Sequence, residues 1–277
     1  MFPLFAFFLL PGILSAAALS FSPEEPIQGE PILITVTGTT TLADIASMTF
    51  GGSPLKPFSY QGRPAALYGI DINKKPGTYS VIAVLKDGTT LRKQTVVGMR
   101  EKYEAPLGIP AKLGGNTEAS AKKVVDTLAL ENATLVGLRT GDHAFWTEKF
   151  RYPLASTTVT DPYGYSRNTL SYTITHKGTD FRAAEGTKVM AMNRGVVRLV
   201  RTYTEYGKTV IVDHGLGLMT FYMHLSKILV NPGELVLPGQ VIGLSGQTGY
   251  AEQPHLHLTV RINDISIDPI AFMGLFK

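Results

Sequence analysis

The chain has 277 residues, a hydrophobic content of 44%, a formal net charge of +4 and no cysteine. This length is sufficient for two domains with separate cores, and the hydrophobic content is that of a folded protein. The lack of cysteine excludes disulfides, thiolate catalysis and cysteine-based zinc sites. The positive charge is diffuse and forms no block of Lys and Arg, so nucleic-acid binding is not supported.

Residues 1–18 have the features of a signal peptide. The run is apolar, the first charged residue is Glu24, and small residues at positions 16–18 resemble a cleavage site after Ala18. We therefore expect export to the periplasm or cell envelope. The alternative is an uncleaved segment that associates transiently with the membrane, since the run approaches the ~20 residues that span a bilayer. Nothing in the sequence indicates an oligomeric state.

Residues 21–99 consist of short apolar runs separated by turns, which predicts an Ig-like β-sandwich. Ile32, Ile34 and Val36 alternate with Leu33 and other residues, as on a strand. Asp87-Gly88 predicts a hairpin with a type I′ turn, in which both residues have positive φ. This region contains no histidine. We expect it to fold separately and to be dispensable for the chemistry.

Residues 100–150 are predicted to form a linker with one helix. Asn116 is a candidate N-cap, and one helical face carries Val124, Val125, Leu128 and Leu135. His143 lies close in sequence to Trp146, the single tryptophan, and is expected to pack rather than to bind a ligand.

The histidines of residues 151–277, a strand-rich region, stand in short motifs. In "PHLHL" a strand would place His255, His257 and Thr259 on one face and apolar residues on the other. The two imidazoles would then be roughly 7 Å apart, close enough for one to bind a metal while the other works beside it. An ordinary half-buried strand is the equal alternative at this point.

Two further motifs contain His176 and His224. In "THKGTD", His176 and Asp180 would be about 13 Å apart on one extended strand, too far to share a metal. A turn at Gly178 would bring them together. His224 follows Tyr222 by two residues and is expected on the same strand face, with Phe221 and Met223 opposite. His214 is expected to be a turn residue, because glycines flank it.

Two imidazoles and one carboxylate form a typical catalytic zinc set, with the fourth position open to water. Such a zinc ion lowers the pKa of water to about 7 and polarises a carbonyl, which suits amide hydrolysis. The sequence has no H-E-x-x-H motif. The spare histidines are therefore candidates for proton transfer.

As a set, these motifs resemble the lysostaphin/LytM-type zinc metallopeptidases of family M23, which cut peptidoglycan peptides. The resemblance covers roughly residues 150–272 and includes "GKTVIVDHGLGLMTFYMHLS" and "PGELVLPGQVIGLSGQTG". It implies an antiparallel β-rich peptidase domain over residues 151–277 and peptidoglycan as the partner. By position, one Zn²⁺ per chain would be bound by His176, Asp180 and His257, beside the catalytic histidines His224 and His255.

Two segments depart from the family pattern, "AEQP" at 251–254 and "DPYGYSRNTLSYTIT" at 161–175, so the groove is expected to differ there. Two alternatives to a zinc endopeptidase are considered. One is a non-hydrolytic LytM-like regulator of other cell-wall hydrolases, whose relatives have lost ligands. The other is a carbohydrate- or peptide-binding β-protein with a structural metal, a kind of site usually closed by four protein ligands.

Overall fold

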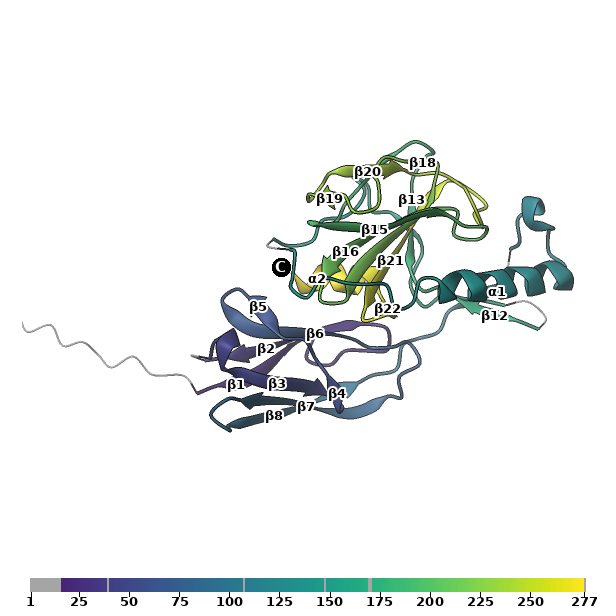
Figure 1. Cartoon of the computed structure of the whole chain (residues 1–277). Coiled ribbons are helices and arrows are strands. Elements are labelled where there is room, and N and C mark those ends of the chain that lie inside the picture. Colours follow the sequence, from purple (N-terminus) through teal and green to yellow (C-terminus); the bar gives the residue numbers. More distant parts are fainter. Residues whose placement is uncertain (1–15, 39, 107, 147, 169–170, 277) are drawn as a thin grey trace, which may run out of the picture.

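The computed structural model describes residues 16–38, 40–106, 108–146, 148–168 and 171–276 (Figure 1). Most of the predicted signal segment, residues 1–18, lies outside these ranges, so its role stays a prediction. Ala18 already begins the first strand. Within the described ranges, no helix has both the length and the apolar content to cross a membrane.

The N-terminal region forms two four-stranded antiparallel sheets around a shared core. One sheet has the order β1-β2-β6-β5, with bounds Ala18–Ser22, Pro31–Thr37, Arg63–Gly69 and Phe58–Tyr60. The other has the order β4-β3-β7-β8, with bounds Ser53–Pro54, Ile45–Phe50, Gly77–Leu85 and Thr90–Val97. A short 3₁₀ turn, Leu42–Asp44, precedes β3. As the alternation predicts, Ile32, Ile34 and Val36 point into the core between the sheets.

The predicted hairpin at Asp87-Gly88 joins β7 and β8, but its turn is not of type I′. Only Gly88 has positive φ, at +88°, whereas Asp87 does not. The loop between the paired residues Leu85 and Thr89 has three residues, one more than a type I′ turn. The Asp87 side chain accepts a hydrogen bond from the Thr89 N–H at 2.8 Å and stabilises this longer turn.

The segment after residue 100 contains a helix, α1 (Glu118–Ala133), as predicted, and a short strand, β9 (Glu104–Pro106). The helix N-cap is Thr117, whose Oγ1 accepts from the Ser120 N–H, whereas Asn116 instead accepts from the Ile109 N–H. A 3₁₀ turn, Ala111–Leu113, lies between β9 and α1. Val124 is buried as expected, but the helix ends before Leu135. β9 pairs in parallel with β11 (Ser166–Asn168), which in turn pairs with β12 (Thr173–Thr175).

The C-terminal region is built on an eight-stranded antiparallel sheet of order β10-β13-β21-β17-β16-β15-β19, with β22 on β21. The bounds are Val159–Asp161, Thr179–Arg182, His255–Ile262, Leu218–Leu225, Lys208–Gly215, Gly195–Thr202, Leu235–Val236 and Ile265–Ile267. A small sheet packs nearby, β14-β20-β18, with bounds Lys188–Met190, Val241–Leu244 and Lys227–Ile228. The last element is helix α2, Pro269–Leu275.

The N-terminal and C-terminal regions lie side by side (Figure 1) and share a hydrophobic cluster, so they pack directly against each other. Leu33 and Phe58 from the first sheet pack in the same cluster as Trp146 and Phe272. An ion pair of 3.0 Å between Arg100 and Asp268 lies beside it, with both side chains mostly buried. The division into domains at residues 21–99, 100–150 and 151–277 stays a prediction. The shared cluster joins residues from all three ranges.

We expect Phe58→Ala to destabilise both regions together. Phe58 is 5% exposed and contacts the ring of Trp146 edge-on at 5.4 Å. Deleting a buried phenylalanine ring costs about 3–5 kcal/mol. Denaturant unfolding followed by far-UV circular dichroism and by fluorescence of Trp146, the single tryptophan, should give one midpoint that shifts in both signals.

Phe50→Ala is the matched control, because Phe50 is fully buried in the separate N-terminal core. In one cooperative unit it moves the same midpoint. Two separated transitions, with Phe58→Ala shifting only one, would instead favour independent folding of residues 21–99.

Candidate metal centre

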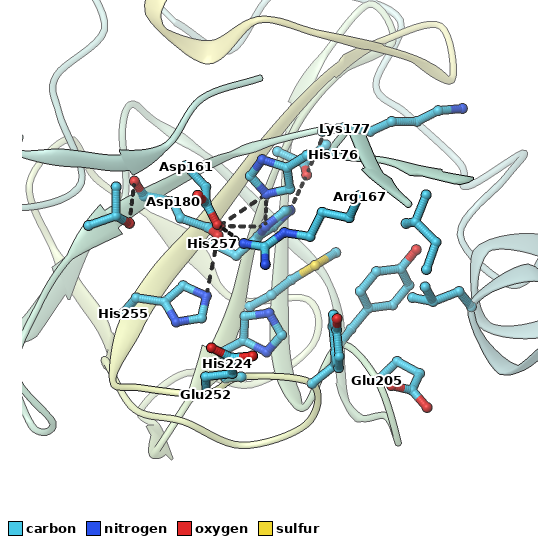
Figure 2. Close-up of a pocket in the computed structure, with 18 of the residues that line it drawn as sticks. Asp161, Arg167, His176, Lys177, Asp180, Glu205, His224, Glu252, His255 and His257 are labelled. Carbon is cyan, nitrogen blue, oxygen red and sulfur yellow. Dashed lines mark hydrogen bonds and ion pairs between the residues drawn. The ribbon is translucent and has the colours of Figure 1, made fainter. Parts of the chain in front are cut away.

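A groove of about 860 Å³ runs over the large sheet where β13 and β21 pair (Figure 2). Its lining includes the five side chains named by the motifs, namely His176, Asp180, His224, His255 and His257. Within the described ranges, His176, Asp180 and His257 are the only group of three or more such side chains whose ligand atoms lie within 4.8 Å of one another.

A turn brings His176 and Asp180 together, as the sequence predicts. His176 directly follows β12, and Asp180 lies on β13, so that Lys177 and Gly178 make the connection. The Nε2 atom of His176 is 3.2 Å from Oδ1 of Asp180. A single extended strand would have kept the two side chains apart.

His257 joins this pair because β13 and β21 are antiparallel and in register at Asp180 and His257. Its Nδ1 is 2.8 Å from Oδ1 of Asp180 and 3.0 Å from Nε2 of His176. Gly178 permits this approach, since a Cβ there would lie 2.4 Å from Nε2 of His257. The expected division of the strand also holds, with Leu256, Leu258 and Val260 in the core.

Hydrogen bonds to the outer ring atoms assign the tautomers of the two histidines. Nδ1–H of His176 donates to the Pro162 carbonyl at 3.0 Å, which leaves Nε2 to face the group. Nε2–H of His257 donates to Oγ1 of Thr259 at 2.9 Å, which leaves Nδ1 facing the group. Partners of this kind fix the ring orientation of metal-binding histidines.

Charge in the group is concentrated on Asp180. Burial alone would raise the pKa of its carboxyl, but the adjacent His176 and His257 hold that pKa well below the usual range. Burial also opposes protonation of His176, although the Asp180 carboxylate outweighs it and raises the pKa of His176. For His257 burial dominates and lowers the pKa. The group therefore offers an ionised carboxylate between two imidazoles.

His255 and His224 lie beside the three-residue group and bind none of its facing atoms closely. Nε2 of His255 is 3.7 Å from Oδ2 of Asp180, and its Nδ1–H donates to the Gln253 carbonyl at 2.8 Å. The ring centroids of His224 lie 4.8 Å from those of His255 and 5.8 Å from those of His257. Nδ1–H of His224 donates to the Thr248 carbonyl at 2.8 Å.

The expected facing of His224 is wrong. Tyr222 points into the hydrophobic core, while Met223 is paired with His257 on β21 and lines the groove. Strict alternation would therefore turn His224 away from the groove. His224 instead has φ +59°, a left-handed backbone conformation that breaks the alternation and returns the ring to the groove face. Burial, followed by the charges of His255 and His257, lowers its pKa to about 3, so the ring is neutral at pH 7.

The two remaining histidines lie outside this group. His214 is not a turn residue, because it lies on β16, fully buried, with Nδ1–H donating to the Arg194 carbonyl at 2.9 Å. Burial lowers its pKa to about 4. His143 contacts the ring of Phe145 edge-on at 4.9 Å, but its side chain is 73% exposed.

The donor set fits a zinc ion. Two neutral imidazole nitrogens and one carboxylate oxygen lie close together. Three protein ligands are the usual number at a catalytic zinc site. Each facing nitrogen has its partner ring nitrogen already engaged, so no rearrangement of tautomers is needed. The arrangement is open on the groove side, unlike a structural site closed by four ligands.

The walls of the groove include residues that the sequence motifs did not reveal. Gly108, Pro110 and Leu128 come from the segment around α1. The two segments that depart from the family pattern also line it, through Arg167 and through residues 251–254. Arg167 forms an ion pair with Asp161 and lies near His257 in Figure 2. Such wall residues carry no motif, because their position depends on how distant segments pack.

A second acidic side chain, Glu205, is buried in the groove wall at 2% exposure. Among the described residues its Oε2 atom has no hydrogen-bond partner. Burial, followed by the negative charge of Glu131, raises the pKa of Glu205 to about 7. This carboxyl is thus close to half-protonated at neutral pH.

Comparison with known proteins is consistent with the geometry of the site. Residues 174–269 match peptidase family M23. The peptidoglycan DD-endopeptidase ShyA of Vibrio cholerae serotype O1 is 34% identical over 215 residues, which are 72% of this chain and 47% of ShyA. The DD-carboxypeptidase/endopeptidase Mpg of Neisseria meningitidis serogroup B is 37% identical over 120 residues, 43% of this chain and 28% of Mpg.

A solved structure is similar over nearly the whole chain. The putative peptidase M23 from Pseudomonas aeruginosa has a TM-score of 0.64 and 26% identity, and the match covers 91% of this chain and 96% of that one. The fold and the site define a metallopeptidase-type domain. The chain contains a peptidase family M23 domain, matched over residues 174–269. It spans less than half the length of ShyA or Mpg.

We expect Glu205→Gln to remove a loss of stability that the wild-type protein shows as pH rises. The folded-state pKa of about 7 lies above the ordinary value of 4.5, so the folded protein holds this proton more tightly. The stability that the protonated Glu205 carboxyl contributes is fully present below about pH 4.5 and is lost as pH rises through about 7. The difference in thermal midpoint between variant and wild type should therefore grow in favour of the variant from pH 5 to pH 8. An equal difference at both pH values would contradict the raised pKa.

Proposed function

We propose that the protein is an exported zinc metalloendopeptidase that hydrolyses peptide bonds in the cross-links or stem peptides of peptidoglycan. The observation that carries the proposal is the convergence of His176, Asp180 and His257 at one end of an open groove, with two further imidazoles beside them. The similarity to ShyA, a peptidoglycan DD-endopeptidase, and to Mpg, a DD-carboxypeptidase/endopeptidase, supports the substrate class.

In this proposal, Nε2 of His176, a carboxylate oxygen of Asp180 and Nδ1 of His257 hold one zinc ion per chain. When bound, the zinc would supply electrophilic polarisation of the scissile carbonyl and would lower the pKa of the attacking water. The β13–β21 register and the bonds to Pro162 and Thr259 would keep these three side chains oriented toward the zinc ion.

His224 and His255 are proposed as the catalytic histidines. Each donates Nδ1–H to a backbone carbonyl, which leaves Nε2 as the ring atom available to exchange a proton. Either ring can therefore take a proton from the attacking water. The imidazolium that results can then donate to the developing oxyanion or to the leaving amine. Burial of His224 favours the neutral ring at the start of this sequence.

We also propose that residues 21–99 form an Ig-like β-sandwich domain, that residues 100–150 link it to the peptidase, and that residues 1–18 direct export. The two packed antiparallel sheets support the assignment of residues 21–99 as a β-sandwich. This region would place or restrain the peptidase on the wall.

Digestion of purified sacculi tests the function. The zinc-loaded protein should release soluble muropeptides, and mass spectrometry of the products would identify the bond cleaved. Protein treated with a chelator should release none until zinc is restored. Full zinc occupancy without any product from wall of several cross-link types would instead favour a non-hydrolytic regulator.

The pair His255 and His257 separates metal binding from proton transfer. We expect His257→Ala to lose both zinc and activity. His255→Ala should keep stoichiometric zinc, because its ring lies beside the ligands, and should lower turnover by about 10²-fold. Metal analysis and muropeptide release on the same samples check both. Loss of zinc from His255→Ala with retention by His257→Ala would reverse the assignment.

A further inference from the structure

The end of helix α1 inserts a carboxylate into the C-terminal region. Glu131 is 8% exposed, although it belongs to the helix between the two predicted domains. Its Oε1 accepts from the Thr204 N–H at 2.5 Å, and its Oε2 accepts from the N–H groups of Glu205 and Tyr206 at 3.1 and 3.2 Å. Three successive backbone N–H groups thus converge on one anion, an arrangement that holds a turn firmly.

The turn held by Glu131 contacts the backbone of His224. The Tyr206 carbonyl accepts from the N–H of His224 at 3.1 Å. His224 needs such support, because its φ of +59° is a costly conformation for a residue with a side chain.

The same turn also packs against the loop that holds the ring of His224. The Glu205 carbonyl accepts from the Tyr250 N–H at 2.7 Å. The two backbones touch directly, since a Cβ on Gly249 would lie 2.3 Å from the Glu205 carbonyl oxygen and one on Gly207 would lie 2.4 Å from that of Thr248. Thr248 is the residue whose carbonyl accepts Nδ1–H of His224.

We infer that Glu131 is a positioning residue for His224, acting through the turn of residues 204–207. The inference rests on the proposed function, in which His224 is a catalytic histidine. It deepens that function by making helix α1 part of the peptidase machinery. A fragment that begins near residue 148 lacks Glu131 and would leave three N–H groups of the turn without their acceptor. The inference therefore extends the peptidase unit beyond residues 151–277 to the end of α1.

A merely adhesive role for Glu131 is the competing explanation, and Thr134→Val separates the two. Oγ1 of Thr134 lies 2.9 Å from the Tyr203 hydroxyl, a contact from the same end of α1 to the same region. Valine has nearly the shape of threonine but removes this hydrogen bond and the one that Oγ1 of Thr134 donates to the backbone carbonyl of Glu131 at 2.7 Å. It removes neither the bonds from the turn to the Glu131 carboxylate nor the bond from the turn to His224.

The experiment compares full-length, zinc-loaded Glu131→Gln, Glu131→Ala and Thr134→Val with wild type. Long-range ¹H–¹⁵N spectra of ¹⁵N-histidine protein, assigned with a His224 variant, report the ring of His224. Hydrogen exchange reports the amides of Glu205, Tyr206 and His224. Both Glu131 variants should shift the His224 ring signals and speed exchange of these amides, whereas Thr134→Val should do neither.

Turnover on sacculi should fall about 10- to 100-fold in the Glu131 variants, with KM and zinc content nearly unchanged, as for a displaced catalytic group. If Glu131→Ala fails to fold, Glu131→Gln, which has the same size, decides. Unchanged His224 signals in Glu131→Gln, or equal changes in Thr134→Val, would overturn the inference. An inactive wild type would refute the proposed function, while the spectra and exchange rates would still test the link between Glu131 and His224.

Discussion

The antiparallel register between β13 and β21 is the constraint on which the site depends. It places Asp180 directly opposite His257, and the turn at Gly178 then brings His176 back over the same pair. A shift of one residue would turn the whole histidine face of β21 into the core. The buried residues Leu256, Leu258 and Val260 oppose that shift, because it would expose them. The hydrophobic core therefore fixes the positions of Asp180 and His257 relative to each other.

The resemblance named His176, Asp180 and His257 from sequence, and local patterns explain part of how they are placed, whereas the pairing of Asp180 with His257 joins distant segments. In His176…Asp180 a glycine allows the turn, and in His255-Leu-His257 the period of a strand sets the facing. His224 could not be oriented in this way, since alternation assumes an extended backbone and its φ is +59°. The same limit explains His214, where flanking glycines indicated a turn although the residue ends a buried strand.

The β-rich architecture and the existence of one helix between residues 100 and 150 also followed from local patterns. The packing of the N-terminal sheet against the peptidase region did not. Leu33 was expected on the opposite face from Ile32 and Ile34, which is correct. That face is not open to solvent, because Leu33 packs in the cluster that the two regions share. The alternation assigns a face to each side chain and is silent about what covers that face.

Glu131 illustrates a related limit and shows why changes in sequence texture need not separate functions. Its partners are backbone N–H groups, which every residue except proline offers, so no side-chain motif marks the contact. The helix that carries it reads as a linker, because its other buried residues form a small apolar face. Yet this helix supplies part of the groove wall and the anion beneath the turn that supports His224. The inferred boundary of the working unit is therefore set by the hydrogen bonds between Glu131 and residues 204–206, and not by the start of the strand-rich region at residue 151.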